Sequence, residues 1–304
     1  MSEALITKQG VYPWLLAARP KTLSAAVTPI LISTILSYHY SLIGNYKNII
    51  FLSLLALFSA IFIQIGTNLI NDALDFKKGA DNENRLGPKR VTQSGLLTAK
   101  QVMMGGFLSF LISVLIAIPL VMHSGLPIII IGFVSLLFGY LYTGGPYPLA
   151  YKGLGEIFVI FFFGLVAVGG VFYLQTGFLN TAALIAGLEV GLLATVLISI
   201  NNYRDYLEDR KVSKMTLAAR FGARFAKYEI LFLYISTYTI HLYWFMEINF
   251  WTAFLPFLTL PLAIKIVKEV FQQEPSSIFN KYLGMSALLQ LIFGILFSIG
   301  ILIG

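Results

Sequence analysis

Two polar segments stand out in an otherwise apolar chain. Residues 68–81 read NLINDALDFKKGAD, and residues 201–211 read NNYRDYLEDRK. Each begins where a long apolar run ends, and together they contain five aspartates in a chain with only 14 Asp and Glu. Carboxylates next to apolar spans are costly unless something positive meets them. These stretches, called here the first and second polar segments, are where we expect the function to lie.

The composition is typical of an integral membrane protein. Hydrophobic residues make up 58% of the 304 residues and charged residues only 12%, whereas soluble domains have about 45–50% apolar and about 25% charged residues. The mean hydropathy is +0.82. The absence of cysteine excludes disulfides and thiolate metal sites. The N-terminus lacks the pattern of a cleaved signal peptide, and we interpret residues 1–304 as a single transmembrane domain.

The apolar runs predict an all-α protein with nine transmembrane helices. A helix needs about 20 apolar residues to cross the hydrocarbon core of a bilayer. Such runs lie at roughly 23–42, 49–71, 101–121, 127–143, 154–175, 181–201, 226–244, 250–267 and 282–303.

The basic residues predict the orientation. The net charge of +7 could suggest a nucleic-acid partner, but all of the 21 Lys and Arg except Lys47 fall on one side of the predicted spans. Cytoplasmic loops carry the excess of Lys and Arg. We therefore expect a cytoplasmic N-terminus, an outside C-terminus and a location in the cell (inner) membrane. Both polar segments then face the cytoplasm.

The spacing within the polar segments predicts two faces rich in oxygen ligands. Residues three and four apart share a helix face. The oxygen-bearing residues are Asn68, Asn71, Asp72 and Asp75 in the first segment and Asn201, Asp205 and Asp209 in the second. Hard oxygens suit Mg²⁺. Two such faces, opposed across a central cavity that opens to the cytoplasm, would hold two ions and bridge a diphosphate, which makes the four aspartates candidate catalytic residues.

A structural interpretation competes with this one. Asn and Asp are common caps at helix ends, and two acids four residues apart often form a solvated face. That two such segments lie at membrane ends on the same side favours the functional interpretation.

Basic residues follow each polar segment. Arg85 and Arg90 lie in a loop with Gly87, Pro88 and Gly95, and Lys214 follows the second segment. Arginine and lysine both bind phosphate oxygens. We expect these three side chains to bind the diphosphate. The alternative is that they only fix the membrane orientation.

A third stretch, residues 140–156, reads YLYTGGPYPLAYKGLGE. Its Gly and Pro predict a tight turn, and Tyr142, Tyr147 and Lys152 offer aromatic faces and donors for an aromatic acceptor. A tyrosine belt at the membrane interface would give the same pattern.

The histidines do not point to catalysis. His39, His123 and His241 all lie away from the polar segments, and we find no Ser-His-Asp arrangement, Walker loop or dinucleotide fingerprint. Glu189 lies inside a predicted span. An acid at such a position is functional by default, but the sequence assigns it no role.

The motifs together resemble a known family over nearly the whole chain. The pattern N-D-x-x-D at 71–75 and D-x-x-x-D at 205–209 is similar to the UbiA superfamily of intramembrane prenyltransferases. Closer similarity is to the branch that prenylates 1,4-dihydroxy-2-naphthoate in menaquinone synthesis. It comes from Asn71-Asp72-x-x-Asp75-Phe76-x-x-Gly79-x-Asp81 and Arg85-x-Gly87-Pro88-x-Arg90-x-x-Gln93-Ser94-Gly95, from Arg19-Pro20-Lys21-Thr22-Leu23, from Tyr142-Thr143-Gly144-Gly145-Pro146 and from Lys214-x-Thr216-Leu217. In the 4-hydroxybenzoate branch a third Asp stands where this chain has Gly79, and Asp81 follows two residues later.

The resemblance implies an activity. Asp faces, with Asp81 among the metal ligands, would hold Mg²⁺ on the diphosphate of a long polyprenyl donor, and Lys21 would join the diphosphate-binding residues. Ionisation of the allylic C–O bond would let the naphthoate ring attack, with loss of carbon dioxide and diphosphate, to give demethylmenaquinol. The expected partners are the two substrates and the lipid bilayer. Another aromatic acceptor, such as 4-hydroxybenzoate, is the alternative within enzymes, and a cation-coupled transporter is the rival from another class.

Overall fold

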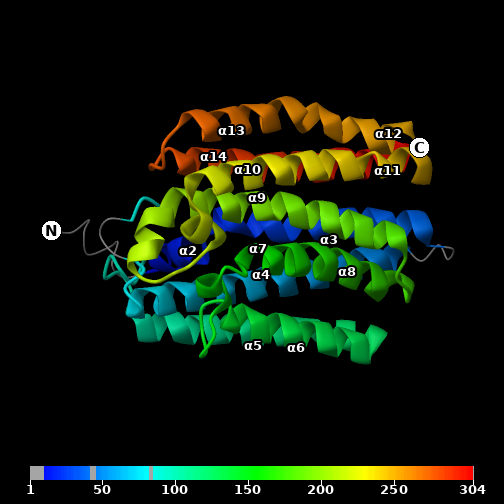
Figure 1. The fold of residues 1–304 in the computed structure, drawn as a ribbon. Helices are drawn as coiled ribbons and strands as arrows, with labels where there is room; N and C mark the ends of the chain where they lie inside the picture. The colour runs from blue at the N-terminus through cyan, green and yellow to red at the C-terminus, as the bar shows by residue number, and fades with distance from the viewer. Residues whose placement is uncertain (1–9, 42–45, 82–84, 304) are drawn as a thin grey trace.

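The computed structural model describes residues 10–41, 46–81 and 85–303, and within these ranges its regular structure is helical throughout. Long apolar helices run side by side in a bundle (Figure 1). The long elements are α3 (Pro20–Tyr40), α4 (Tyr46–Lys77), α5 (Ala99–Ser124), α6 (Leu126–Leu141), α9 (Thr181–Lys211), α10 (Leu217–His241), α13 (Leu260–Gln272) and α14 (Phe279–Ile303).

The long helices of the bundle are called rods here, and two rods are composite, each made of several consecutive elements. One rod consists of α7 (Gly155–Val159), the π-helical turn η2 (Ile160–Val166) and α8 (Ala167–Thr176), and the other of α12 (Phe250–Phe254), η3 (Leu255–Thr259) and α13. The remaining short elements are α2 (Tyr12–Ala18), η1 (Leu149–Lys152) and α11 (Tyr243–Glu247).

Each of the nine predicted spans overlaps one of these rods. Within the described residues, six rods are long and apolar enough to cross a membrane: Asn48–Lys77, Ala99–Ser124, Gly155–Thr176, Thr181–Lys211, Phe250–Gln272 and Phe279–Ile303. Helix α6 is apolar but short. Helix α10 is long enough, but Arg224, Lys227 and Glu229 interrupt its apolar character. The all-helical membrane fold is thus confirmed, with six spans supported by length and composition.

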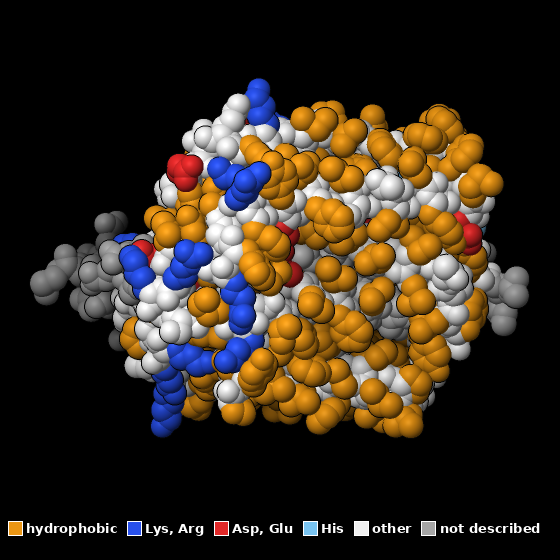
Figure 2. Space-filling model, in the orientation of Figure 1, with side chains coloured by type: hydrophobic (Ala, Val, Ile, Leu, Met, Phe, Trp, Pro, Cys, Tyr) orange, Lys and Arg blue, Asp and Glu red, His pale blue; other side chains and the backbone are white. Residues whose placement is uncertain are grey.

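Helices α4 and α9 continue beyond their apolar parts. The first polar segment forms the last turns of α4, which ends at Lys77, and the second forms the last turns of α9, which ends at Lys211. Both helices end at the same end of the bundle (Figure 1). Lys and Arg side chains gather at this end, whereas the flank visible in Figure 2 is mostly hydrophobic. The end of α14 lies at the opposite end.

Helix α9 is the core of the bundle, because most of its residues are buried and it packs against α10, η2, α14 and α3. Its contact with η2 is very close. A Cβ atom on Gly164 would lie 2.3 Å from the carbonyl oxygen of Gly187 and 2.8 Å from the Cα of Gly191. Small residues let helix backbones approach in this way within membranes. The close contact fixes η2 against α9, and α7, which directly precedes η2, also packs against α9.

Candidate active site

A polar cavity of about 230 Å³ lies between the ends of α4 and α9. Both polar segments contribute to its wall, as do the loop after α4, the turn after α6 and the start of α7. Its polar and charged lining residues are Arg19, Thr22, Gln64, Thr67, Asn68, Asn71, Asp75, Arg85, Arg90, Tyr142, Thr143, Glu156, Asn201, Asn202, Lys214 and Thr216. Segments that are far apart in the sequence therefore share one cavity, called here the polar cavity.

The amides and one carboxylate of the first segment line this cavity. Tyr151 donates a hydrogen bond from its hydroxyl to Oδ1 of Asp75 at 2.8 Å. The hydroxyl of Thr143 donates to the side-chain oxygen of Asn71. These partners fix the rotamers of both side chains while leaving lone pairs on their oxygens.

Asn68 joins the first segment to the N-terminal part of the chain. Its side-chain nitrogen donates to the carbonyl of Ala18 at 3.1 Å and to the hydroxyl of Thr22 at 3.0 Å.

Asp72 and Asp81 are buried but do not line the cavity. The carboxylate of Asp72 accepts hydrogen bonds from the backbone nitrogens of Val91 and Thr92, at 3.3 and 3.4 Å, and from the Thr92 hydroxyl. It thereby fastens the loop that follows α4.

Asp81 binds the two arginines of this loop. Its Oδ1 lies 2.5 Å from Nη1 of Arg85 and its Oδ2 lies 3.5 Å from Nε of Arg90. The loop is therefore shaped by carboxylates of the first segment.

Three guanidinium groups meet at one side of the cavity. Burial, together with the positive charges of Arg19 and Arg85, lowers the pKa of Arg90 to about 9. Burial also lowers the pKa of Arg85, but Asp81 and Asp205 outweigh this and raise it above its usual value. Arg90 remains charged at neutral pH, with like charges as neighbours. An anion bound here would relieve that repulsion.

The second segment is organised by Arg204, which is only 1% exposed. Its guanidinium donates to both oxygens of Asp205, at 2.8 and 2.5 Å, and to the side-chain oxygens of Asn201 and Asn280, at 2.7 and 2.5 Å. A Cβ atom on Gly87 would lie 2.6 Å from Nη2 of Arg204, so the loop after α4 packs directly on this group. One buried arginine thus connects α9, α14 and that loop.

Lys214 completes the basic lining of the cavity. Its Nζ lies 3.6 Å from Oδ1 of Asp209. Burial lowers the pKa of Lys214, but Asp209 and Asp75 outweigh burial and raise it above its ordinary value. This ammonium group therefore stays charged in the cavity wall.

The residues of the third stretch separate in the structure. Tyr142 lines the cavity. Tyr147 is 58% exposed and Lys152 is also exposed, with its Nζ 5.0 Å from the Tyr147 ring centre, and neither lines the cavity. Tyr151, next to them in the sequence, is buried and binds Asp75. The side chain of Lys21 lies outside the described part of the chain.

The structure places three further residues in or against the cavity, which the sequence patterns did not indicate as site residues: Arg19, Arg204 and Glu156. A signal was present for the first two: Arg204 directly precedes Asp205, and Arg19 begins the RPKTL motif. Glu189, by contrast, accepts hydrogen bonds from Trp244 at 3.1 Å and pairs with His241 at 3.3 Å, all buried in the bundle. It does not line the polar cavity.

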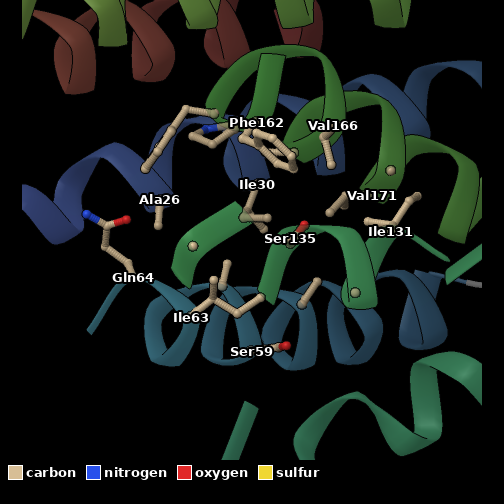
Figure 3. A pocket seen from close by; sticks show the side chains of 18 of the residues that line it. Ala26, Ile30, Ser59, Ile63, Gln64, Ile131, Ser135, Phe162, Val166 and Val171 are labelled. Atoms are coloured by element: carbon tan, nitrogen blue, oxygen red, sulfur yellow. The ribbon is translucent and has the colours of Figure 1, made fainter. Parts of the chain in front are cut away.

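An apolar cavity of about 220 Å³ adjoins the polar one. The two share the lining residues Gln64, Thr67, Tyr142, Val159 and Phe163. Figure 3 shows apolar side chains of the second cavity, including Ile30, Ile63, Phe162 and Val166, with Gln64 at one side. A molecule with a charged head and a long apolar tail would match this pair of cavities.

The oxygen donors of the polar cavity fit a hard divalent cation. Asn71, Asp75 and Asn201 line the cavity with side-chain oxygens. The described residues contain no group of three His, Cys, Asp or Glu able to hold a metal by themselves. The carboxylate of Asp75 beside Asn71 and Asn201 suits Mg²⁺, which proteins commonly hold through one or two carboxylates plus substrate phosphates and water.

Comparisons with known proteins show the family of the chain. Residues 26–304 match the UbiA prenyltransferase family. The chain is 35% identical to the 1,4-dihydroxy-2-naphthoate octaprenyltransferase of Haemophilus influenzae, over 96% of both chains. It is 32% identical to the protein of the same name from Escherichia coli, over 95% of this chain and 94% of that protein.

Solved structures share the fold. A UbiA homolog from Archaeoglobus fulgidus bound to DMAPP and Mg²⁺ has a TM-score of 0.60 at 16% identity, covering 94% of this chain and 99% of that one. A UbiA homolog from Aeropyrum pernix has a TM-score of 0.62 at 14% identity, covering 93% and 97%. The chain thus belongs to the UbiA prenyltransferase family.

Proposed function

We propose that this protein transfers a polyprenyl group from polyprenyl diphosphate to 1,4-dihydroxy-2-naphthoate, with loss of carbon dioxide and diphosphate, to give demethylmenaquinol. The observation that carries the proposal is the junction of a cation-lined polar cavity with an apolar one. The relatives named as octaprenyltransferases for this naphthoate support the choice of acceptor.

The basic lining would bind the donor's diphosphate. Arg19, Arg85, Arg90 and Lys214 supply four cations around the cavity. Guanidinium groups bind phosphate oxygens in pairs, and their strength increases in a buried site. Negative charge grows on the diphosphate as the allylic C–O bond breaks, so these groups stabilise the transition state more than the ground state.

In our proposal, the oxygen donors of both polar segments would hold two Mg²⁺ ions. The proposed ligands are Asn68, Asn71, Asp75 and Asn201, which line the polar cavity, together with the buried Asp72, Asp81, Asp205 and Asp209, which do not line it. The four aspartates at 72, 75, 205 and 209 would carry most of the charge. Bound Mg²⁺ supplies charge neutralisation on the diphosphate. A UbiA homolog solved with GPP and Mg²⁺ supports this use of the ion.

The apolar cavity would take the prenyl tail and exclude water from the allylic cation. Phe158 and Phe162 stack in its wall, with ring centres 5.6 Å apart, and Tyr142 stands at its border with the polar cavity. Aromatic faces attract cations in desolvated sites. The acceptor ring would enter beside Tyr142, while Tyr147 and Lys152 would contact it at the cavity entrance.

The same proposal places the chain in the cell membrane with nine spans, the N-terminus in the cytoplasm and the C-terminus outside. The gathering of Lys and Arg at the end of the bundle that holds the polar cavity supports this orientation. A donor whose tail lies in the bilayer then meets a water-soluble acceptor at the cytoplasmic surface.

The test is transfer by purified protein in detergent, without a membrane gradient. We expect a prenylated quinol from polyprenyl diphosphate, the naphthoate and Mg²⁺, and much less product from 4-hydroxybenzoate. Asp75→Asn should reduce the rate at least about tenfold, which is a loss of ~1.4 kcal/mol in the transition state.

The matched control for Asp75→Asn is Glu208→Gln. Glu208 pairs with Lys211 and does not line the cavity, so this variant should keep the wild-type rate. Absence of prenylated product from the wild-type protein would overturn the proposal, and a gradient-driven flux of a cation would favour the transporter.

A further inference from the structure

Glu156 lines the polar cavity and has one carboxylate oxygen without a hydrogen-bond partner. The residue stands at the start of α7, lines the cavity and is only 4% exposed. Its Oε1 accepts a hydrogen bond from the side-chain nitrogen of Asn202 at 2.7 Å. Its Oε2 is buried and has no hydrogen-bond partner. Buried polar atoms are nearly always paired, so this one needs an explanation.

The charge of Glu156 has no described Lys or Arg paired with it. A second acid, the partly buried Glu229 of α10, also has one buried oxygen without a partner but does not line the cavity. An unpaired carboxylate in an apolar environment is costly. A cavity ligand that donates a hydrogen bond would remove that cost.

The surroundings of Glu156 indicate what kind of ligand that is. The hydroxyl of Tyr142 lies close to Gly155, the residue before Glu156. A Cβ atom on Gly155 would be 3.1 Å from this hydroxyl oxygen. Val159 and Phe163, one and two turns further along the same rod, line both cavities. Glu156 therefore stands where polar lining meets apolar lining, beside an aromatic ring. A flat aromatic ring that bears a hydroxyl group matches this combination.

We propose that Glu156 binds a hydroxyl group of the aromatic acceptor and takes its proton as the new C–C bond forms. This inference rests on the proposed function. It assigns Glu156 as a catalytic residue that activates the acceptor, separate from the aspartates and cations that act on the donor. Asn202 holds the carboxylate in place through the 2.7 Å hydrogen bond.

The proton and electron pairs balance in this scheme. The allylic C–O bond breaks, and its electron pair leaves with the diphosphate. The ring carbon that bears the carboxylate attacks the allylic carbon, and the adjacent hydroxyl becomes a ketone as its proton passes to Glu156. The bond to the carboxylate then breaks, carbon dioxide leaves, and the electron pair moves to the ketone oxygen. That oxygen recovers the proton, which regenerates the quinol and the Glu156 carboxylate.

The test compares wild type and Glu156→Gln on the naphthoate and on its two monomethyl ethers, with polyprenyl diphosphate and Mg²⁺ in detergent. General base catalysis contributes about 10²–10⁴-fold. Glu156→Gln should therefore transfer to the naphthoate at least about 100-fold more slowly, while its KM for the donor stays within about threefold of wild type. Gln can still accept from Asn202, so the melting temperature should stay close to that of wild type.

The ethers separate a catalytic role from a structural one. Wild type should prefer the free hydroxyl to one of the two ethers by about 100-fold or more, and this preference should fall at least tenfold in Glu156→Gln. Glu156→Asp, which keeps a carboxylate, should be slower than wild type but retain the preference. Glu208→Gln is the control and should match wild type.

Two outcomes are distinguishable. If wild type transfers to the naphthoate and Glu156→Gln does so at a similar rate, or with an unchanged preference for the free hydroxyl, the role of Glu156 is refuted and the proposed function stands. If wild type itself gives no product, the proposed function is refuted.

Discussion

The substitution Arg204→Met should destabilise the protein more than any other replacement of a basic side chain near the cavity. Arg204 is buried and gives two hydrogen bonds to Asp205 and one each to Asn201 and Asn280. Methionine fills similar volume but leaves Asp205 buried without its counter-charge. Removing one partner of a buried ion pair costs about 3–5 kcal/mol.

Arg204→Lys separates charge from geometry. Lysine keeps one positive charge but cannot reach Asp205 and Asn280 at once with a planar fork. Hydrogen bonds to a charged group contribute about 1.5–3 kcal/mol each. We expect its free energy of unfolding to lie between those of wild type and Arg204→Met. The KM for the donor should also rise, because Asp205 and the loop containing Gly87 would lose their common support.

The measurement is the free energy of unfolding in mild detergent on titration with a denaturing detergent. Lys211→Met is the matched control, because Lys211 is on the same helix and its side chain is 66% exposed. Exposed ion pairs contribute about 0–1 kcal/mol. If Arg204→Met and Lys211→Met unfold with free energies within about 0.5 kcal/mol of each other, the buried network does not hold the two polar segments together and the reasoning fails.

Three further results are expected. Turnover should stop in excess EDTA and return with Mg²⁺, partly with Mn²⁺, because the ligands are hard oxygens; full activity in EDTA would contradict this. Arg90→Ala should slow transfer and raise the KM for the donor or for the naphthoate, whereas Lys77→Ala at the exposed end of α4 should not. Equal losses of activity in the two variants would remove the loop from the site. Gly164→Ala should lower the free energy of unfolding by about 1–3 kcal/mol, because its Cβ would meet the backbone of α9. Gly284→Ala, with open space around it, should be neutral or stabilising, and melting temperatures check both.

The helical membrane fold and the two polar segments could be predicted from the sequence because both follow from local patterns. Long apolar runs require helices in a bilayer. The three- and four-residue spacing of Asn and Asp requires that the helix continue past the apolar run, and both α4 and α9 do so. The resemblance to the prenyltransferase family rests on these same positions, and the family match confirms it.

The partners of each side chain could not be predicted in this way. Spacing places Asp72 and Asp75 near one face, but the loop that returns over α4 binds Asp72 and leaves Asp75 to the cavity. Arg204 resembles any basic residue at a membrane boundary until α14 brings Asn280 against it. Glu156 has no motif around it that marks it as reactive. These assignments depend on contacts between segments that are distant in sequence.

The π-helical turn η2 explains how one rod lines a long cavity. The apolar cavity is lined by Phe158, Phe162, Val166 and Gly170, each four residues after the last. In an α-helix four residues rotate by about 400°, so such a series drifts about 40° per step away from the cavity. The wider turn of η2, with its i→i+5 hydrogen bonds, offsets that drift. The same turn directs Gly164 at the backbone of α9. Close packing against α9 and a continuous apolar lining therefore have a common origin, and a sequence pattern read with the α-helical period would not reveal it.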